Sequence, residues 1–216
     1  MSRKLTCNPA DPENETVAAA AEALIAGEVV VIPTETQYSL SVRADNEKAM
    51  KKIKRIKKRN EALKPALFVK DIDAANKFCV VGKQARRLAE GFLPGPLTLV
   101  MPGRRNQKAV AADFESELGF GIRISSSPLI AAIIERVPFP VTATSANISG
   151  ETTPASIEAI TELLGDEVGL YLDGGPCRGI TPSTVVYAGE DIRILRPGLI
   201  GEAEIKRYLG EESING

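Results

Sequence analysis

The chain has 216 residues, enough to bury one sizeable core, and its 27 basic and 28 acidic residues give a net charge of −1. This balance argues against a wholly basic nucleic-acid binder. The chain contains no histidine, which excludes imidazole-based triads, histidine-ligated metals and histidine general bases. Any chemistry must therefore use hydroxyls, carboxylates, lysine and arginine, or the substrate itself.

The cysteines and the N-terminus indicate the compartment. Cys7, Cys79 and Cys177 are scattered without a CxxC pair, which fits a reducing environment and predicts neither a disulfide framework nor a metal site. The first residues lack the apolar core of a signal peptide, and no apolar run reaches membrane-spanning length. We therefore expect a cytoplasmic protein that does not contact the membrane.

The first half of the chain alternates predicted helices and strands. Apolar residues recur at helical spacing over 15–26, and Gly27 stands where a helix C-terminus favours glycine. The apolar run that follows predicts a buried strand that stops at Pro33. Asn46 is expected to cap a helix running to about Arg59. The other elements expected here are strands at 29–32, 38–42, 66–69 and 97–101 and helical segments at 71–79 and 83–92.

The second half continues the alternation. The polar stretch 103–117 is expected to be an exposed excursion. Ser127, as a cap, and Pro128, in the first turn, indicate a helix start. The remaining elements expected are strands at 120–124, 139–143, 170–173, 185–187 and 192–195 and helices from 127 to about 136, at 157–164 and at 202–209. This alternation predicts an α/β fold. We expect one domain over 1–216, with its core at about 16–209.

Three hydroxyl-rich clusters, at 34–38, 144–149 and 181–184, adjoin predicted strands. Open α/β sheets place their ligands at strand ends, although each cluster alone could be only a turn. The sequence has neither the dinucleotide-binding GxGxxG after a strand nor the Walker loop, so a nucleotide site would have to be built differently.

Cations concentrate in residues 48–64, where nine lysines and arginines accompany one acid, a local charge of +8. The segment could be a solvated helix face, an RNA-binding surface or, through its C-terminal end, a clamp for polyphosphate. Arg123 raises a second question, because an arginine within an apolar strand needs a partner. That partner could be a structural carboxylate or a bound carboxylate or phosphate.

These clusters together resemble the YrdC-like family of L-threonylcarbamoyl-AMP synthases, over about 16–209 and with the motifs in family order. The motifs are Pro33-Thr34-Glu35-Thr36 with Tyr38, Lys57-Lys58-Arg59, Lys64-Pro65, Leu93 to Thr98, Gly121-Ile122-Arg123, Thr144 to Asn147 with Ser149-Gly150, Ser183-Thr184, and Leu195 to Gly198. The resemblance implies a twisted mixed sheet with flanking helices and a basic cavity. It also implies synthesis of threonylcarbamoyl-AMP and pyrophosphate from L-threonine, bicarbonate and ATP, for a modified adenosine in tRNA.

The resemblance also implies roles for individual residues. L-Threonine would be held by Thr36, Arg123, Ser145 and Ser183, with Tyr38 lining its pocket. ATP would be bound by Arg59, Lys64, Asn147 and Arg196, and Lys57 would support the phosphates, so that Lys57 and Arg59 are the catalytic candidates. Mg²⁺ would be bound mainly through ATP. Glu35 is the nearest candidate for a base, with a structural role slightly favoured. Partners could include RNA at the basic helix and a threonylcarbamoyl transferase.

The chain departs from the family pattern at two motifs. Ser39-Leu40-Ser41 replaces Gly-Leu-Gly, and Lys57-Lys58-Arg59-Asn60 replaces Lys-Gly-Arg-Pro. Where the replaced glycine has a positive φ, a side chain costs about 1 kcal/mol or more. Two alternatives to the synthase follow: a divergent paralogue that binds a nucleotide or amino acid without making the adenylate, and an RNA-binding module. The scarcity of aromatic residues disfavours the module.

Overall fold

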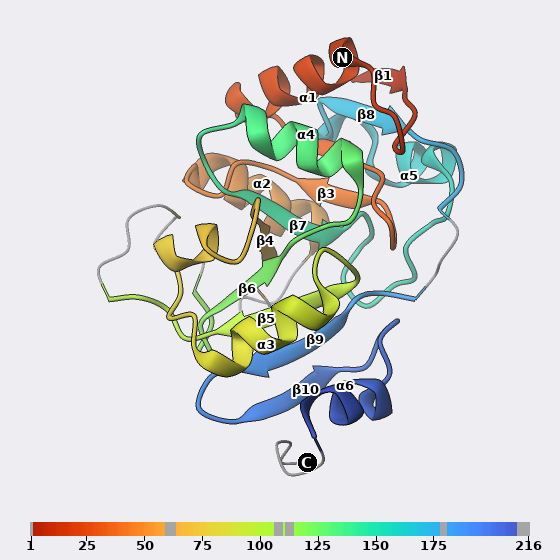
Figure 1. Ribbon diagram of the computed structural model, residues 1–216. Helices are drawn as coiled ribbons and strands as arrows, with labels where there is room; N and C mark the ends of the chain where they lie inside the picture. Colours follow the sequence, from red (N-terminus) through yellow and green to blue (C-terminus); the bar gives the residue numbers. More distant parts are fainter. Residues whose placement is uncertain (1, 59–63, 106–109, 111–114, 178–180, 211–216) are drawn as a thin grey trace.

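The computed structural model describes residues 2–58, 64–105, 110, 115–177 and 181–210, and Figure 1 shows a twisted sheet flanked by helices. Ten strands of the described chain form this sheet in the order β1-β8-β2-β3-β7-β4-β6-β5-β9-β10. The strands are β1 (Arg3–Thr6), β2 (Val30–Ile32), β3 (Ser39–Ser41), β4 (Ala66–Phe68), β5 (Leu97–Met101), β6 (Phe120–Arg123), β7 (Val141–Ser145), β8 (Leu170–Asp173), β9 (Thr184–Ala188) and β10 (Ile192–Arg196). The predicted mixed α/β fold is confirmed.

Strand pairing brings the polar clusters into the middle of the sheet. β2 and β3 form an antiparallel hairpin, so the polar segment 33–38 becomes its loop. β3 then pairs antiparallel with β7, which places Ser39 directly opposite Ser145. β4 pairs antiparallel with β7 and parallel with β6, and β5 pairs parallel with β9. Residues that are far apart in sequence therefore meet around the centre of the sheet.

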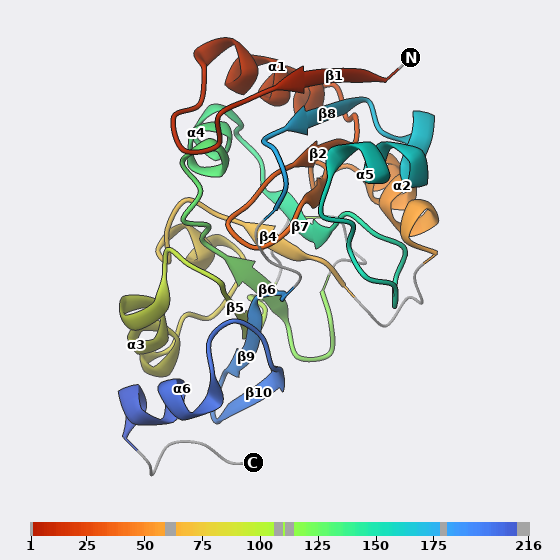
Figure 2. The ribbon, with the colours of Figure 1, turned by 90° about the vertical axis from the view of Figure 1, so that its right-hand side faces the viewer.

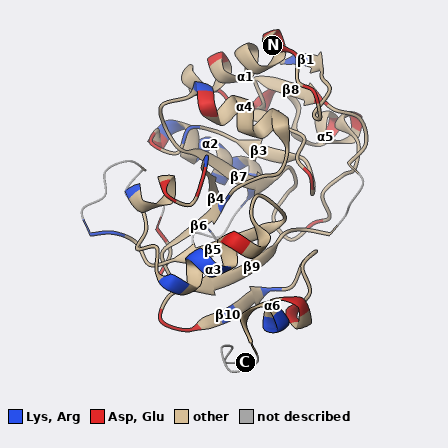
Figure 3. Ribbon diagram, in the orientation of Figure 1, with Lys and Arg blue, Asp and Glu red and all other residues tan. Residues whose placement is uncertain are grey.

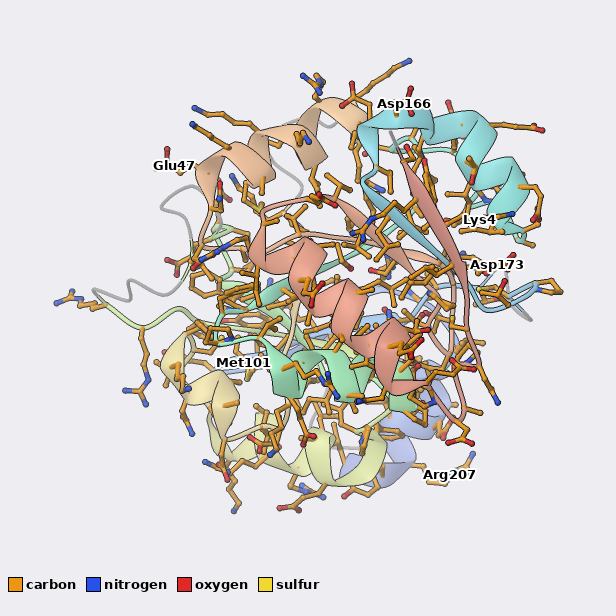
Figure 4. The ribbon with its side chains drawn as sticks, turned by 90° about the horizontal axis from the view of Figure 1, so that it is seen from above. Lys4, Glu47, Met101, Asp166, Asp173 and Arg207 are labelled. Carbon is orange, nitrogen blue, oxygen red and sulfur yellow. The ribbon has the colours of Figure 1, made fainter. Side chains whose placement is uncertain are left out.

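Helices cover both faces of the sheet and enclose two hydrophobic cores (Figure 2). The described helices are α1 (Asn14–Ile25), α2 (Glu47–Lys57), α3 (Lys83–Phe92), α4 (Pro128–Arg136), α5 (Ile157–Leu164) and α6 (Glu202–Leu209), with short 3-10 turns at Ala74–Lys77 and Gly165–Glu167. α1 and α4 lie side by side over one face, as Figure 4 shows from above, and bury Leu24, Leu129 and Ile133. The larger core contains residues of α2, α3, α5 and α6.

Several elements coincide with their predicted ranges, because clear start and stop signals bound them. Helices 83–92, 157–164 and 202–209 and strands 97–101 and 170–173 have the expected limits. The segment expected to be helical at 71–79 contains only the 3-10 turn Ala74–Lys77. The strand expected at 139–143 is β7, Val141–Ser145, because pairing with β3 and β4 extends it to Ser145.

Three further expectations are corrected at element ends. Ser127 precedes α4, but its hydroxyl makes no capping hydrogen bond. α2 ends at Lys57 rather than near Arg59, because Lys58 adopts a left-handed conformation that stops the helix. β1 was not predicted: it is short and mostly exposed, and it joins the sheet edge by pairing with the distant β8. No helix within the described ranges is both long and apolar enough to cross a bilayer.

Part of the stretch 103–117, expected to be an exposed excursion, lies outside the described residues. Val110 contradicts the expectation locally, because its side chain is buried in the larger core. The backbone of Gly103 forms a bridge to Cys79, and Ser116 pairs with Gly119 in a tight turn. The described parts of the excursion therefore include a backbone bridge to Cys79 at one end and a tight turn at the other.

Candidate active site

One cavity of about 630 Å³ collects the candidate site residues. Its walls come from the β2–β3 loop, the C-terminal end of α2, the central strands, the start of β9 and the end of β10. Nine of the ten sequence-predicted residues line it: Thr36, Tyr38, Lys57, Lys64, Arg123, Ser145, Asn147, Ser183 and Arg196. The tenth, Arg59, lies outside the described residues. The structure therefore brings residues from seven separate motifs to one place.

Thr34 organises the loop that follows β2. Its hydroxyl donates a hydrogen bond to the carbonyl oxygen of Gln37 at 2.7 Å. Oγ1 of Thr34 also accepts hydrogen bonds from the backbone N–H groups of Thr36 at 3.1 Å and Gln37 at 3.2 Å. Such side-chain-to-backbone bonds are what make threonine favourable in turns. Thr36 is thereby held at the cavity wall, with its hydroxyl 3.0 Å from that of Thr34.

Arg123 has a structural partner and still faces the cavity. Its Nη2 donates to Oε1 of Glu35 at 2.9 Å and to Oγ1 of Thr36 at 2.6 Å. The other carboxylate oxygen of Glu35 accepts a hydrogen bond from Ser125. Both oxygens of Glu35 are thus engaged, and Glu35 is not among the described lining residues, which supports a structural role for it. Nε of Arg123 is buried without a partner in the described chain and remains available to an anion.

Lys57 points inward from the last turn of α2 and is only 3% exposed. Its ammonium donates to the carbonyl oxygens of Ser145 at 2.6 Å and Asn147 at 3.0 Å, and to Oδ1 of Asn147 at 2.8 Å. The hydroxyl of Ser145 also donates to that Oδ1 at 2.6 Å. An ammonium has three N–H donors, and these three contacts account for them. Lys57 therefore holds the Ser-Ala-Asn loop in place.

Arg196 and Ser183 join the two ends of the β9–β10 hairpin. Nη2 of Arg196 donates to the carbonyl oxygen of Ser183 at 2.9 Å, and the hydroxyl of Ser183 lies 3.0 Å from that of Thr98 on β5. Burial, and next the positive charge of Arg123, lower the pKa of Arg196 from its ordinary value. The guanidinium groups of Arg123 and Arg196 thus line the same cavity, and their combined positive charge favours a bound anion.

Tyr38 and Lys64 complete the predicted set. The hydroxyl of Tyr38 donates to the carbonyl oxygen of Gly175 at 2.7 Å and accepts from the N–H of Gly174 at 3.2 Å. Its polar tip therefore anchors the loop after β8, and burial raises its pKa. Lys64 lines the cavity beside Pro65.

Most of the basic helix faces away from the cavity. Lys48, Lys51, Lys52 and Arg55 are exposed on α2, and Figure 3 shows this run of cations along the ribbon. Arg55 forms an ion pair with Glu167. Of the described cations between 48 and 64, only Lys57 and Lys64 line the cavity. The polyphosphate-clamp hypothesis therefore applies to the end of this segment and not to its whole face.

The three glycine replacements differ in backbone geometry. Ser39 and Ser41 lie in β3, and neither has a positive φ. Lys58 has φ 46°, the one positive φ at a non-glycine residue in the described chain. The expected backbone cost therefore falls at Lys58, and the serines occupy ordinary strand positions.

No role was predicted for Thr98 and Ser39, which line the cavity, or for Gly198, which packs against the residues around Ser183. Gly198 lies so close to the Ser183 strand that a Cβ atom would stand 2.4 Å from the amide nitrogen of Thr184 and 2.5 Å from the carbonyl oxygen of Pro182. Thr98 lies within the family motif but offered no further signal. Contacts of this kind depend on strand pairing, which a single sequence does not reveal.

The described lining contains four cationic side chains and many hydroxyls and no carboxylate. A cavity of this kind is suited to anionic groups, such as phosphates and carboxylates. With the mixed sheet, this defines an α/β protein with a cationic cavity. The family model for Sua5, YciO and YrdC proteins, described as "Telomere recombination", matches residues 22–198, and the chain belongs to this family.

Three family members illustrate how similar this chain is to its relatives in sequence and in fold. The threonylcarbamoyl-AMP synthase of Bacillus subtilis is 34% identical over 93% of this chain, which spans 57% of that protein. The crystal structure of Pyrococcus abyssi Sua5 complexed with L-threonine has a TM-score of 0.89 and 28% identity, covering 99% of this chain and 63% of that one. Escherichia coli YciO, an uncharacterized protein, has a TM-score of 0.86 and 26% identity, covering 95% of this chain and 99% of that one.

Proposed function

We propose that this protein is an L-threonylcarbamoyl-AMP synthase that uses L-threonine, bicarbonate and ATP and serves the threonylcarbamoyl modification of tRNA. The observation that carries the proposal is the convergence of Arg123, Lys64, Arg196 and the loop held by Lys57 on one cavity. The synthase name of the B. subtilis relative and the threonine complex of P. abyssi Sua5 support it.

The substrates would be placed in two adjoining parts of the cavity. Arg123 would bind the threonine carboxylate, with Thr36, Ser145 and Ser183 offering hydroxyls to its polar groups and Tyr38 closing the wall. Lys64, Asn147 and Arg196 would bind ATP, together with Arg59, whose role rests on the resemblance alone. The contact of Arg196 with Ser183 joins the two parts, since one residue is assigned to each substrate.

The reaction balances without a nucleophile from the protein. The threonine amine and bicarbonate give a carbamate and water, and a carbamate oxygen then attacks the α-phosphorus of ATP. The bond to the β-phosphate breaks, and pyrophosphate leaves with the electron pair. The chain would contribute position and charge: the cations offset the phosphate charge, and Lys57 keeps Ser145 and Asn147 in place.

Mg²⁺ would accompany ATP and neutralise charge on its phosphates. The described cavity lining supplies no carboxylate for it, and Mg²⁺ in phosphate sites keeps several waters. The donor set of this chain therefore fits an ion held by phosphate oxygens and water. No cluster of three potential metal-ligating side chains occurs in the ranges that the structure describes.

The test is pyrophosphate release from ATP and bicarbonate, with L-threonine present, absent or replaced by serine, and with mass detection of the adenylate. Threonine-dependent release is expected. Arg59→Ala should lower turnover by orders of magnitude while the exposed Lys52→Ala leaves it unchanged. Unaltered kinetics in the Arg59 variant would remove Arg59 from the site.

A second candidate is a divergent paralogue that binds ATP or an amino acid without forming the adenylate. The structural likeness to YciO, which covers nearly all of both chains, favours it. Folded protein that binds ATP saturably but releases no pyrophosphate would support this candidate. Recovery of activity in the Ser39→Gly, Ser41→Gly double variant would then attribute the loss to the serines.

Contact with RNA or with a threonylcarbamoyl transferase also remains a proposal. The exposed cations of α2 offer a surface that could contact phosphates. Binding of tRNA that weakens steeply with rising salt, and that falls further in a Lys48→Ala, Lys51→Ala, Lys52→Ala variant, would support it. Salt-insensitive binding, or no change in that variant, would contradict it. Co-purification with a transferase tests the second partner.

A further inference from the structure

Ser39 is fixed as a hydrogen-bond acceptor at the cavity wall. Its hydroxyl donates to the carbonyl oxygen of Thr144 at 3.2 Å and lies 3.1 Å from the hydroxyl of Ser41. A carbonyl oxygen can only accept, so the single proton of Ser39 goes to Thr144, and Ser41 donates to Ser39. One lone pair of the Ser39 oxygen is thereby used, and the other remains for a donor.

The position of Ser39 in β3 places it at the cavity wall. Directly opposed residues of an antiparallel pair project to the same side of the sheet. Ser39 opposes Ser145, whose hydroxyl belongs to the Lys57 cluster, and both residues line the cavity. Ser41 is fully buried behind Ser39 and is not among the described lining residues.

An acceptor at this place has particular value because the charged side chains of the described lining are all cations, which only donate. A ligand that carries both a carboxylate and an amine satisfies the cations with the first group. The second group needs oxygen acceptors, and the amine of an amino acid supplies up to three N–H donors. A hydroxyl whose proton is already committed suits this task better than a freely rotating one.

We propose that Ser39 is a substrate-binding residue that accepts a hydrogen bond from the amine of the amino-acid substrate, with Ser41 orienting its hydroxyl. The inference rests on the proposed function and deepens it, since it assigns an acceptor for the reacting nitrogen. It also assigns a role to the two serines that replace glycines in Ser39-Leu40-Ser41: Ser39 contacts the substrate, and Ser41 orients Ser39.

The experiment measures L-threonine binding by calorimetry, and turnover in parallel, for the natural chain, Ser39→Ala and Ser41→Ala. Ser39→Ala should weaken threonine binding about tenfold, the usual cost of a hydrogen bond to a charged group, with the KM for ATP unchanged. Ser41→Ala removes the donor that orients Ser39 but leaves the Ser39 oxygen in place, so it should weaken threonine binding less than Ser39→Ala does. Lys52→Ala, on the exposed face of α2 and outside the described cavity lining, is the control and should change neither constant.

The outcomes separate this inference from the proposed function. Equal threonine affinity in the natural chain and Ser39→Ala overturns the role of Ser39, even if turnover is normal. A parallel rise in the KM for ATP and threonine in Ser39→Ala also overturns it, because it indicates a general distortion. Selective loss of threonine binding without any turnover by the natural chain upholds Ser39 and overturns the synthase. No threonine binding by the natural chain overturns both.

Discussion

The ammonium of Lys57 lies 2.8 Å from Oδ1 of Asn147, so the last turn of α2 is fastened directly to the loop after β7. The same ammonium contacts the carbonyl oxygens of Ser145 and Asn147. A lysine at the end of a basic helix would ordinarily extend into solvent. Here it is buried, and it sets the position of two residues that we assign to different substrates.

Lys57→Met should lower the free energy of unfolding by about 3 kcal/mol and raise the KM for both ATP and threonine. The substitution keeps most of the side-chain volume but removes three buried hydrogen bonds donated by a charged group. Chemical denaturation and steady-state kinetics measure the two effects. Lys52→Ala, on the exposed face of the same helix, is the control and should change stability by no more than about 0.5 kcal/mol. Unchanged stability in Lys57→Met would contradict the anchoring role.

Lys58→Gly should stabilise the protein by about 0.5–1 kcal/mol, because glycine adopts φ 46° without the steric cost that lysine bears there. Ser41→Gly, at a buried strand position with ordinary φ, should instead destabilise it by a similar amount. Urea midpoints of the two variants therefore move in opposite directions. A lower urea midpoint for Lys58→Gly, as for Ser41→Gly, would show that Lys58 carries no backbone strain.

Gly198→Ala should raise the KM for ATP at least tenfold, with a loss of about 1–3 kcal/mol in stability. A Cβ atom there meets backbone atoms that cannot move aside independently, so the Arg196 turn must shift away from Ser183. Gly201→Ala is the matched control, because a Cβ atom at Gly201 meets nothing within 4 Å. We expect its KM for ATP to stay unchanged. Equal KM values for ATP in the two variants would show that the position of the Arg196 turn does not affect nucleotide binding.

Alkaline pH should destabilise the fold through thiols that folding withdraws from water, Cys79 fully and Cys177 in part. Burial raises the pKa of Cys79 to about 12 and that of Cys177 to about 11, from an ordinary value of 9.0. Above pH 9 the unfolded chain therefore releases thiol protons that the folded chain retains, and stability falls as pH rises. The loss should be roughly 1 kcal/mol per thiol per pH unit between pH 9 and 11. Denaturation at pH 8, 9, 10 and 11 measures it, and Cys79→Ala should show a shallower decline than the natural chain.

The sequence predicted most of the fold because its periodic segments are bounded by clear signals. Helix 83–92 and strand 97–101 are separated by Pro94-Gly95-Pro96, and both have their predicted limits. β1 escaped prediction because four mostly exposed residues have no periodic pattern, and their strand conformation comes from β8. β7 ends two residues later than expected because its neighbours, not its own composition, set its length.

The candidate residues could be named from motifs, but their arrangement could not. The partner of Arg123 proved to be Glu35, which lies 88 positions away in sequence. The contacts of Lys57 span a similar separation, and no local pattern reports which acceptors its ammonium reaches. Likewise, the backbone angles that distinguish Lys58 from Ser39 and Ser41 follow from where α2 stops and where β3 pairs.

The central claim concerns the carbon atom that joins threonine to the nucleotide, and ¹³C-labelled bicarbonate tests it directly. The protein is incubated with ATP, Mg²⁺, L-threonine and either labelled or unlabelled bicarbonate, and the adenylate is detected by mass. We predict a threonine-dependent adduct that is heavier by one mass unit with the label, formed together with pyrophosphate. An adenylate that does not take up the label, or pyrophosphate release that does not need threonine, would contradict the synthase.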